Sequence, residues 1–356
     1  MVVVNVSVAI VALAAASSVL SAAAPVSPVR LRGGLVKRAG VVKGPVLNTD
    51  FPDPGILLPN GQAPWYAYST SSSHGRVPYA TSQDFNTWSL RGDALPNPGS
   101  WVSSSNSGIW APDVRQITST KYVMYYTGFS ASNNNHCIGA ATSSTPSGPF
   151  TPQSAPILCN AGAGGVIDAS GFQAPGGQLY LVWKVDGNSK GQPTPIFIQP
   201  LASDGFTLTG SATQMITSEA VDGGIVEAPS LVYWSGWYYL FFSSNSYNSL
   251  AYDISYAVSQ SATGPYRKVQ APNAPLLTSG KCGTAGPGGA TVINVLGAFI
   301  LFPRSPAERI LFESDADQYV NAAFHSDING QNAGGGRAMW QISGLTLNNG
   351  VATIIC

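Results

Sequence analysis

The segment Gly236–Ser244, GWYYLFFSS, decides the fold, because it is one of five similar segments at nearly constant intervals. Each is rich in Tyr, Trp, Phe or Val, which favour β-strands, and none carries a helix-capping signature. The five segments are PWYAYSTS (64–71), KYVMYYTG (121–128), QLYLVWKV (178–185), GWYYLFFSS (236–244) and GAFILFPRS (297–305). Their first residues are 57, 57, 58 and 61 residues apart, which indicates a repeat of about 58 residues.

Further strands are predicted on both sides of these segments. The strands that follow lie within 77–90, 137–150, 196–208 and 253–266, and those that precede lie within 51–58, 110–117, 166–173, 226–233 and 286–293. Five such units without helices predict an all-β fold, a five-bladed β-propeller. A two-sheet sandwich would not explain the long period, because its strands recur about every 8–12 residues. The closing blade is expected to take its outer strand from 319–327 or 337–347.

The composition narrows the class of partner. The 356 residues carry no formal net charge, and only 10% are charged, against about 25% in an average protein. No run of Lys or Arg is present, which argues against nucleic acid and anionic membranes as partners. The 39 Gly and 26 Pro residues suit a protein with many turns, and the 10% aromatic content suits a neutral, hydroxyl-rich substrate.

The N-terminus predicts export. Residues 1–24 form an apolar run that ends in small residues, as in a secretory signal peptide. Residues 25–40 then read as a propeptide or linker with a dibasic pair, Lys37-Arg38, before a single catalytic domain over 41–356. A membrane anchor is the alternative, but the weak hydrophobicity after residue 12 favours cleavage. The predicted protein is secreted and monomeric.

Four cysteines fit an exported chain with two disulfides. Of the three pairings, the local one is favoured, Cys137–Cys159 with Cys282–Cys356. The chain contains no Cys-x-x-Cys motif, so a structural zinc site is not expected.

Four of the five preceding strands carry a carboxylate at what reads as one repeated position. These residues are Asp53, Asp113, Asp168 and Glu227, spaced by 60, 55 and 59 residues. Because the first strand of each propeller blade lines the central channel, they are expected to converge at one channel mouth. Buried carboxylates are costly unless paired or used. Glycoside hydrolysis uses one carboxylic acid at the leaving oxygen and one carboxylate to activate water.

The ordered motifs FPDPGI (51–56), WAPDV (110–114), IDASGF (167–172), VEAPSLV (226–232) and GGGRAMW (334–340) resemble the family 43 glycoside hydrolases. Members of that family are five-bladed propellers that act on arabinan, arabinoxylan and xylan. The resemblance covers the chain from about Asn48 to its end. It implies that Asp53 is the general base, Asp168 the residue that modulates the pKa of the acid, and Glu227 the general acid. It also implies that Arg337 lies under the sugar, near Asp168.

Other residues beside these motifs have a structural and a functional interpretation. Asp113 is expected to be structural, accepting backbone N–H bonds, with Trp110 at the cavity wall. Phe51, Trp110 and Phe172 are candidates for stacking on sugar. His74 lies on a first-blade loop and is a candidate for the pocket rim, although an ordinary loop residue explains it equally well.

The fifth blade departs from the family pattern. Many members have a histidine there that binds an ion or water in the channel, whereas this chain has Gly289 in its place. This departure weakens the expectation of a channel calcium, and no cofactor is predicted to be required. His325, on a predicted late strand, is a candidate substitute, with an ordinary structural histidine as the alternative.

The residues and the resemblance together predict an inverting hydrolase. Asp53 would deprotonate water, Glu227 would protonate the glycosidic oxygen, and Asp168 would keep Glu227 protonated. The expected substrate is an α-L-arabinofuranosyl linkage in plant cell-wall arabinan or arabinoxylan, cut by an arabinofuranosidase or arabinanase. A β-xylosidase is the alternative by analogy, and a non-catalytic propeller lectin is the alternative of another class.

Overall fold

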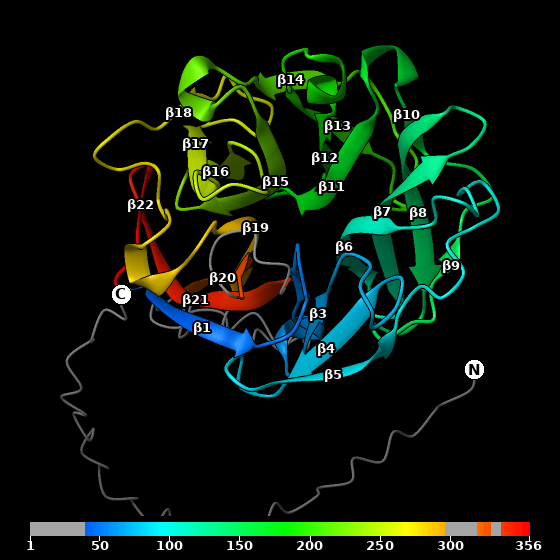
Figure 1. Cartoon of the computed structure of the whole chain (residues 1–356), viewed down its shortest axis with the longest axis horizontal. Helices are drawn as coiled ribbons and strands as arrows, with labels where there is room; N and C mark the ends of the chain where they lie inside the picture. The colour runs from blue at the N-terminus through cyan, green and yellow to red at the C-terminus, as the bar shows by residue number, and fades with distance from the viewer. Residues whose placement is uncertain (1–39, 296–318, 329–335) are drawn as a thin grey trace, which may run out of the picture. The chain divides into compact units, whose positions relative to one another are not determined.

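Five antiparallel sheets follow one another around a common centre (Figure 1), which confirms the predicted five-bladed β-propeller. The computed structural model describes residues 40–295, 319–328 and 336–356. All of them belong to one compact unit, Lys37–Cys356. The predicted signal peptide, the dibasic pair Lys37-Arg38 and the predicted strand 297–305 lie outside the described residues.

The first two blades have four and five strands. Blade 1 contains β2 (Gly55–Leu57), β3 (Trp65–Tyr68), β4 (Pro78–Ser82) and β5 (Trp88–Asp93). Blade 2 contains β6 (Ile109–Thr118), β7 (Lys121–Ser130), β8 (Asn135–Ser143), β9 (Thr151–Pro152) and β10 (Leu158–Cys159).

The third and fourth blades are regular four-stranded sheets. Blade 3 contains β11 (Val166–Gln173), β12 (Leu179–Val185), β13 (Ile196–Leu201) and β14 (Thr213–Ile216). Blade 4 contains β15 (Val226–Trp234), β16 (Trp237–Ser244), β17 (Asp253–Ser259) and β18 (Arg267–Lys268).

The fifth blade joins the two ends of the described chain. It contains β19 (Gly288–Val295), β20 (Tyr319–Asp327), β21 (Arg337–Asn348), β1 (Val41–Leu47) and β22 (Val351–Thr353). The expectation that 319–327 or 337–347 would form the outer strand was wrong. β20 and β21 are the second and third strands, and β1 from the beginning of the described chain pairs outside them. In this way the first described strand fastens the last blade and closes the ring.

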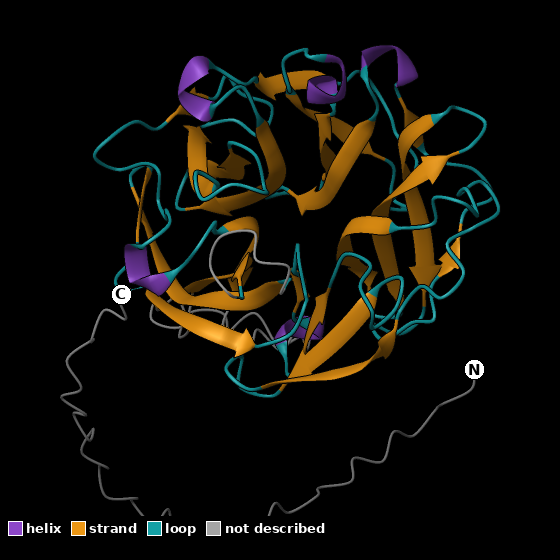
Figure 2. Cartoon of the chain, viewed as in Figure 1, coloured by secondary structure: helices purple, strands orange, loops and turns teal. Residues whose placement is uncertain are grey.

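Helical structure within the described residues is limited to short 3-10 turns between strands (Figure 2). These turns are η1 (Pro59–Gly61), η2 (Ala161–Ala163), η3 (Gly187–Lys190), η4 (Ala220–Asp222) and η5 (Lys281–Gly283). None of the described segments is a helix long and apolar enough to cross a bilayer.

The core lies between blades, because both faces of each inner strand are buried. In β7, Tyr122 and Met124 pack toward blade 1, whereas Val123 and Tyr125 pack toward blade 3. Five such apolar clusters, one at each junction, account for the aromatic runs in the sequence. An apolar residue on either face of a strand is therefore core here, and the strands do not alternate between apolar and polar residues.

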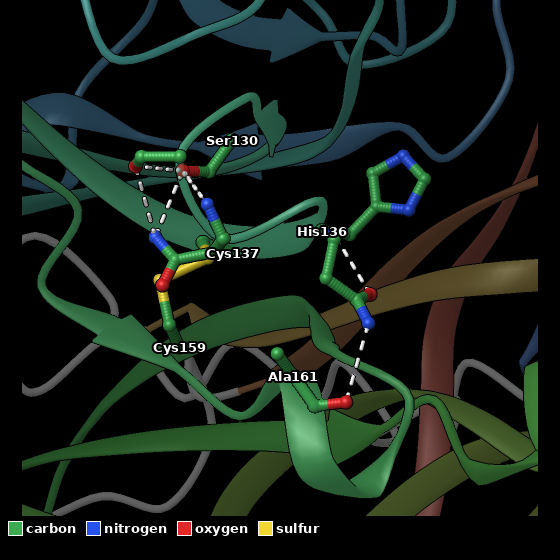
Figure 3. The surroundings of a disulfide bond; sticks show 8 residues. Ser130, His136, Cys137, Cys159 and Ala161 are labelled. Carbon is green, nitrogen blue, oxygen red and sulfur yellow. Dashed lines mark hydrogen bonds between the residues drawn. A yellow bond between two sulfur atoms is a disulfide. The ribbon is translucent and has the colours of Figure 1, made fainter.

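Both predicted disulfides are present. Cys137–Cys159 joins β8 to β10, and the His136 side chain next to it points away from the sulfurs (Figure 3). Cys282–Cys356 fastens the end of the chain to the turn η5. Cross-links of this kind reduce the conformational entropy of the unfolded chain.

A bulge with a left-handed residue near the start of each first strand is the device that shapes the channel mouth. The residue has positive φ in all five blades: Asp53 (52°), Ala111 (42°), Asp168 (56°), Ala228 (51°) and Gly289 (59°). Such backbone is uncommon outside glycine and clusters at functional sites. The expected common position of the four carboxylates was therefore wrong in detail. Asp53 and Asp168 are at the bulge, whereas Glu227 precedes it by one residue and Asp113 follows it by two.

Hydrogen bonds at these bulges tie each blade to the next. The backbone N–H of every bulge residue donates to a side chain of the preceding blade: Ala111 to Thr70, Asp168 to Thr127, Ala228 to Asp168, Gly289 to Ser243, and Asp53 to His325. A second set lies just beyond the bulge. There the Asp113 carboxylate accepts from Gly171 N (2.8 Å) and the Ser230 hydroxyl from Val292 N (2.9 Å). Neighbouring blades are thus joined by buried polar contacts as well as by the core.

Replacing Ser230 by alanine is expected to lower the free energy of unfolding by about 1–3 kcal/mol, because the buried Val292 N–H loses its partner. The measurement is guanidinium unfolding at neutral pH. The matched control is Ser211→Ala on an exposed loop, which should change stability by less than about 0.5 kcal/mol. Equal effects of the two substitutions would contradict the role given to the inter-blade bond.

Candidate active site

The starts of the five first strands surround one small cavity, and the predicted carboxylates gather there. A cavity of about 30 Å³ is lined by the bulge residues, including Asp53, Asp168 and Gly289. It is large enough for a water molecule or two. The bulge turns Asp53 and Asp168 toward this shared space from blades 1 and 3.

Asp53 is held in its ionised form. Its Oδ2 accepts the Thr70 hydroxyl at 2.6 Å, and Arg337 Nη1 lies 3.9 Å from its Oδ1. Burial works against the charge, but the Arg337 guanidinium and the hydrogen bond from the Thr70 hydroxyl outweigh it. The pKa of Asp53 is therefore well below its usual range. A carboxylate that stays ionised at neutral pH can act as a base.

Asp168 has the opposite electrostatic setting. Burial raises the pKa of its carboxyl, and the negative charge of Glu227 raises it further, to about 7. Its Oδ2 accepts a hydrogen bond of 3.0 Å from the N–H of Ala228, which is the residue after Glu227. The negative charge of Glu227 and burial therefore favour a protonated Asp168 carboxyl up to near neutral pH.

Glu227 lies one residue before the bulge of blade 4, with a side chain that is 13% exposed. Its Oε2 is 2.8 Å from the ammonium of Lys184, and its Oε1 accepts the hydroxyl of Tyr252 at 2.9 Å. Burial and the charge of Glu227 raise the pKa of Tyr252 well above its usual value, so the phenol stays a donor. Both oxygens of the carboxyl are thus held in place.

Sequence reasoning missed Lys184 and Tyr252. Lys184 sits inside the apolar segment QLYLVWKV, where it looks like an interruption of a core strand. Its one signal is a lysine at a buried strand position, which requires a buried partner. Tyr252 follows a loop of polar residues and carries no signal of its own.

Arg337 begins β21 and lies at the same mouth, where its guanidinium approaches Asp53 rather than Asp168. Its carbon Cζ also lies 5.1 Å from the centre of the Tyr247 ring, and Tyr247 is exposed. The backbone N–H of Arg337 donates to Asp50 at 2.9 Å. Tyr247, which was not predicted, is therefore an exposed aromatic ring beside the Arg337 guanidinium.

Of the aromatic candidates, Trp110 fits a role at the rim. It is 36% exposed and its ring packs on His136, with ring centres 4.0 Å apart. The expectation for Phe51 and Phe172 was wrong. Phe51 is fully buried in the core between blades 5 and 1, and Phe172 packs in the core between blades 3 and 4. Both were core residues beside acidic motifs in the sequence.

Phe172 also borders a larger cavity of about 770 Å³. That cavity is lined by the far ends of the first strands, including Gln116, Tyr233 and Asn294. Since the carboxylates stand at the beginnings of the same strands, this cavity is separate from the acidic one.

The remaining candidates have structural contacts. Asp113 is 3% exposed and accepts bonds from Arg115 and from Gly171 N, each at 2.8 Å, which agrees with its expected structural role. His74 is exposed and its Nε2 lies 2.8 Å from Thr49 Oγ1. Among the described residues, no hydrogen bond or ion pair joins the His74 ring to the carboxylates.

His325 occupies the space that a side chain at position 289 would need. A Cβ on Gly289 would lie 2.7 Å from both His325 Nδ1 and Asp53 Oδ1. Burial and the charge of Arg337 lower the pKa of His325, so the ring is neutral. Its Nδ1 accepts the Asp53 N–H, and its Nε2 is buried without a partner among the described residues.

Calcium takes about six to eight oxygen ligands. Over the part of the chain that the structure describes, no group of three or more His, Cys, Asp or Glu residues is placed to hold a metal. No step of the mechanism below involves an ion.

Comparison with known proteins agrees with this geometry. The family model "Glycosyl hydrolases family 43" matches residues 42–302. The chain belongs to glycosyl hydrolase family 43. It is therefore a glycoside hydrolase.

One relative by sequence and two solved structures are also similar to this chain. The "Extracellular endo-alpha-(1->5)-L-arabinanase 1" of Bacillus subtilis (strain 168) is 30% identical over 253 residues, which cover 65% of this chain and 73% of that protein. A solved structure of a thermostable family-43 glycoside hydrolase superimposes with a TM-score of 0.67 at 24% identity, covering 86% of this chain and 92% of the other. The endo-1,4-beta-xylanase of Bacteroides thetaiotaomicron VPI-5482 superimposes with a TM-score of 0.64 at 26% identity, covering 88% and 97%.

Replacing Arg337 by glutamine is expected to move the acidic limb of the kcat/KM profile of this family 43 enzyme to higher pH. Arg337 lowers the pKa of Asp53, so its loss raises that pKa, and a base that must be ionised then fails at a higher pH. The measurement is kcat/KM from pH 3 to 8. Arg267→Gln on the exposed strand β18 is the control and should leave the limb in place. An unchanged limb in Arg337→Gln would contradict the pairing of Arg337 with Asp53.

Proposed function

We propose that the protein hydrolyses α-L-arabinofuranosyl linkages in plant cell-wall arabinan, with inversion at the anomeric carbon. The observation that carries the proposal is the contrast between two carboxyls at one cavity. Asp53 is kept ionised, whereas Asp168 has a pKa of about 7 and interacts with Glu227. Carboxyls whose surroundings push their pKa values apart are suited to act as base and acid.

In the proposed mechanism, Asp53 takes a proton from a water molecule while the oxygen of that water attacks the anomeric carbon. Glu227 donates its proton to the glycosidic oxygen, so the bond to the leaving sugar breaks while that oxygen becomes a hydroxyl. The cycle consumes one water, and it leaves Asp53 protonated and Glu227 ionised until solvent restores both. Asp168 keeps the required proton within the pair. Inversion requires a separation of about 6.5–9.5 Å between the Asp53 and Glu227 carboxyls.

The choice of arabinan rests on relatives and on the rim. The Bacillus subtilis relative is named as an endo-arabinanase. The exposed rings of Trp110 and Tyr247 and the guanidinium of Arg337 supply stacking faces and donors for a neutral sugar. A β-xylosidase is the second candidate, because a xylanase structure is similar at 26% identity.

The proposed site of action is extracellular. Support comes from the apolar N-terminal run, from the two disulfides, and from a relative named as extracellular. The proposed reaction needs no cofactor, and the proposed active species is a monomer whose partner is the polysaccharide. A sugar-binding lectin would have no need for an ionised carboxylate beside a carboxyl pair with one proton.

Asp53→Asn and Glu227→Gln are each expected to lower kcat on linear arabinan by about 10²–10⁴-fold, because each removes proton transfer while keeping the shape of the side chain. The measurement is product release from linear arabinan, arabinoxylan and xylo-oligosaccharides, with the anomeric configuration of the first product read by NMR. The control is Glu219→Gln, which changes an exposed carboxylate just before the turn η4, between blades 3 and 4.

Each outcome of this experiment has a distinct meaning. Arabinose or arabino-oligosaccharides from the wild type alone, released with inverted configuration, are the expected result. Release of xylose would favour the xylosidase. Retained configuration would overturn the mechanism, and sugar binding without any product would favour a lectin.

A further inference from the structure

Lys184 breaks a pattern that the other four blades follow. Thr127, Lys184, Ser243 and His325 each pair with the residue that precedes the bulge of their own blade: Trp110, Ile167, Glu227 and Gly288. Thr70 N bonds in the same way to Pro52 O in blade 1. These five residues therefore occupy one equivalent position of the second strand in each blade.

At four of these positions the side chain accepts the N–H of the next bulge. Thr70, Thr127, Ser243 and His325 all have an acceptor atom that serves this bond. A lysine ammonium has three donors and no acceptor. At the junction of blades 3 and 4, the Ala228 N–H therefore donates to Asp168 instead, and Lys184 is left available for another contact.

That contact is with the proposed general acid. Lys184 is 1% exposed, and its Nζ lies 2.8 Å from Glu227 Oε2 and 3.1 Å from Asp186 Oδ1. Burial works against the ammonium, but the charges of Glu227, Asp168 and Asp186 outweigh it and raise the pKa of Lys184 to about 12. The buried cation therefore stays charged throughout the range in which the enzyme could work.

The groups around this ion pair come from several elements. Asp168 faces it from β11, Asp186 from the end of β12, and Tyr252 from the segment before β17. Asp53 contributes charge from blade 1, and His136 lies near Asp186 from β8. A buried ion pair of this kind adds little stability by itself, because desolvation of both ions offsets their attraction.

We propose that Lys184 is a positioning residue for catalysis, which fixes the Glu227 carboxyl and sets the pH range over which the Asp168–Glu227 pair keeps its proton. The inference rests on the proposed role of Glu227 as general acid. One carboxyl oxygen is held by the ammonium and the other by Tyr252, so the orientation of the carboxyl toward the leaving oxygen is fixed before substrate arrives. The positive charge also opposes retention of the proton by the pair, which limits activity at high pH.

The test compares Lys184→Thr, Lys184→Met and Lys184→Arg in the full chain on linear arabinan. Threonine occupies the equivalent position in blades 1 and 2, so the fold tolerates it there. Lys184→Thr therefore gives a second test if the methionine variant does not fold. Loss of the cation is expected to move the basic limb of kcat/KM to higher pH by about one unit or more. We also expect kcat to fall about 10–100-fold, with a smaller change in KM. Lys184→Arg should keep the limb near its wild-type position.

The control is Lys268→Met, which breaks another buried lysine–carboxylate pair, that of Lys268 with Asp222. It should lower stability without moving the limb. The inference would be overturned if the basic limb of kcat/KM stayed at its wild-type pH in both Lys184→Thr and Lys184→Met. It would also be overturned if the limb moved as far in Lys184→Arg as in Lys184→Met. If Glu227→Gln kept full activity, the proposed function itself would fail, and the two failures are therefore distinguishable.

Discussion

The hydrogen bond from each bulge N–H to a side chain of the preceding blade is the contact on which the rest of the site depends. It occurs at all five junctions, and it holds a left-handed residue at the same height in every first strand. Strained backbone persists only where its surroundings determine it. In blades 1 and 3 the strained residue is an aspartate, so the bonds that close the propeller also aim two carboxyls at one cavity.

The charges at that cavity follow from this arrangement. Asp53, Asp168 and Glu227 share the site with two cations. Arg337 approaches Asp53, and Lys184 contacts both Glu227 and Asp186. Asp168 has no cation within ion-pair distance among the described residues, and it is the one whose pKa rises to about 7. Carboxyls therefore outnumber cations here, and a proton on Asp168 relieves part of the excess negative charge. An inverting hydrolase needs one proton at its acid and none at its base.

The fold could be predicted because each blade repeats one apolar strand in which both faces are core. The repeat did not fix the position of the carboxylates within a blade. A bulge adds one residue to a strand, and the short motifs around the four carboxylates can be aligned equally well when shifted by one or two residues. Asp113 and Glu227 were therefore placed at the same position as Asp53, although only Asp168 shares it. β1 escaped notice because it lacks the aromatic pattern of the inner strands. Lys184 was hidden for a related reason, since its importance depends on a partner 43 residues away.

The fifth blade has Gly289 where the family resemblance leads one to expect a histidine, and the packing of Gly289 against His325 explains how this chain accommodates the difference. The bulge of blade 5 has positive φ, and a Cβ there would collide with Asp53 and His325, so glycine relieves both the strain and the clash. The imidazole that fills the space comes from the neighbouring strand, where it accepts the Asp53 N–H and completes the inter-blade bonds. A histidine at 289 and one at 325 would compete for the same volume. Glycine at 289 and histidine at 325 are therefore compatible with each other, and Asp53 keeps a buried imidazole at its side.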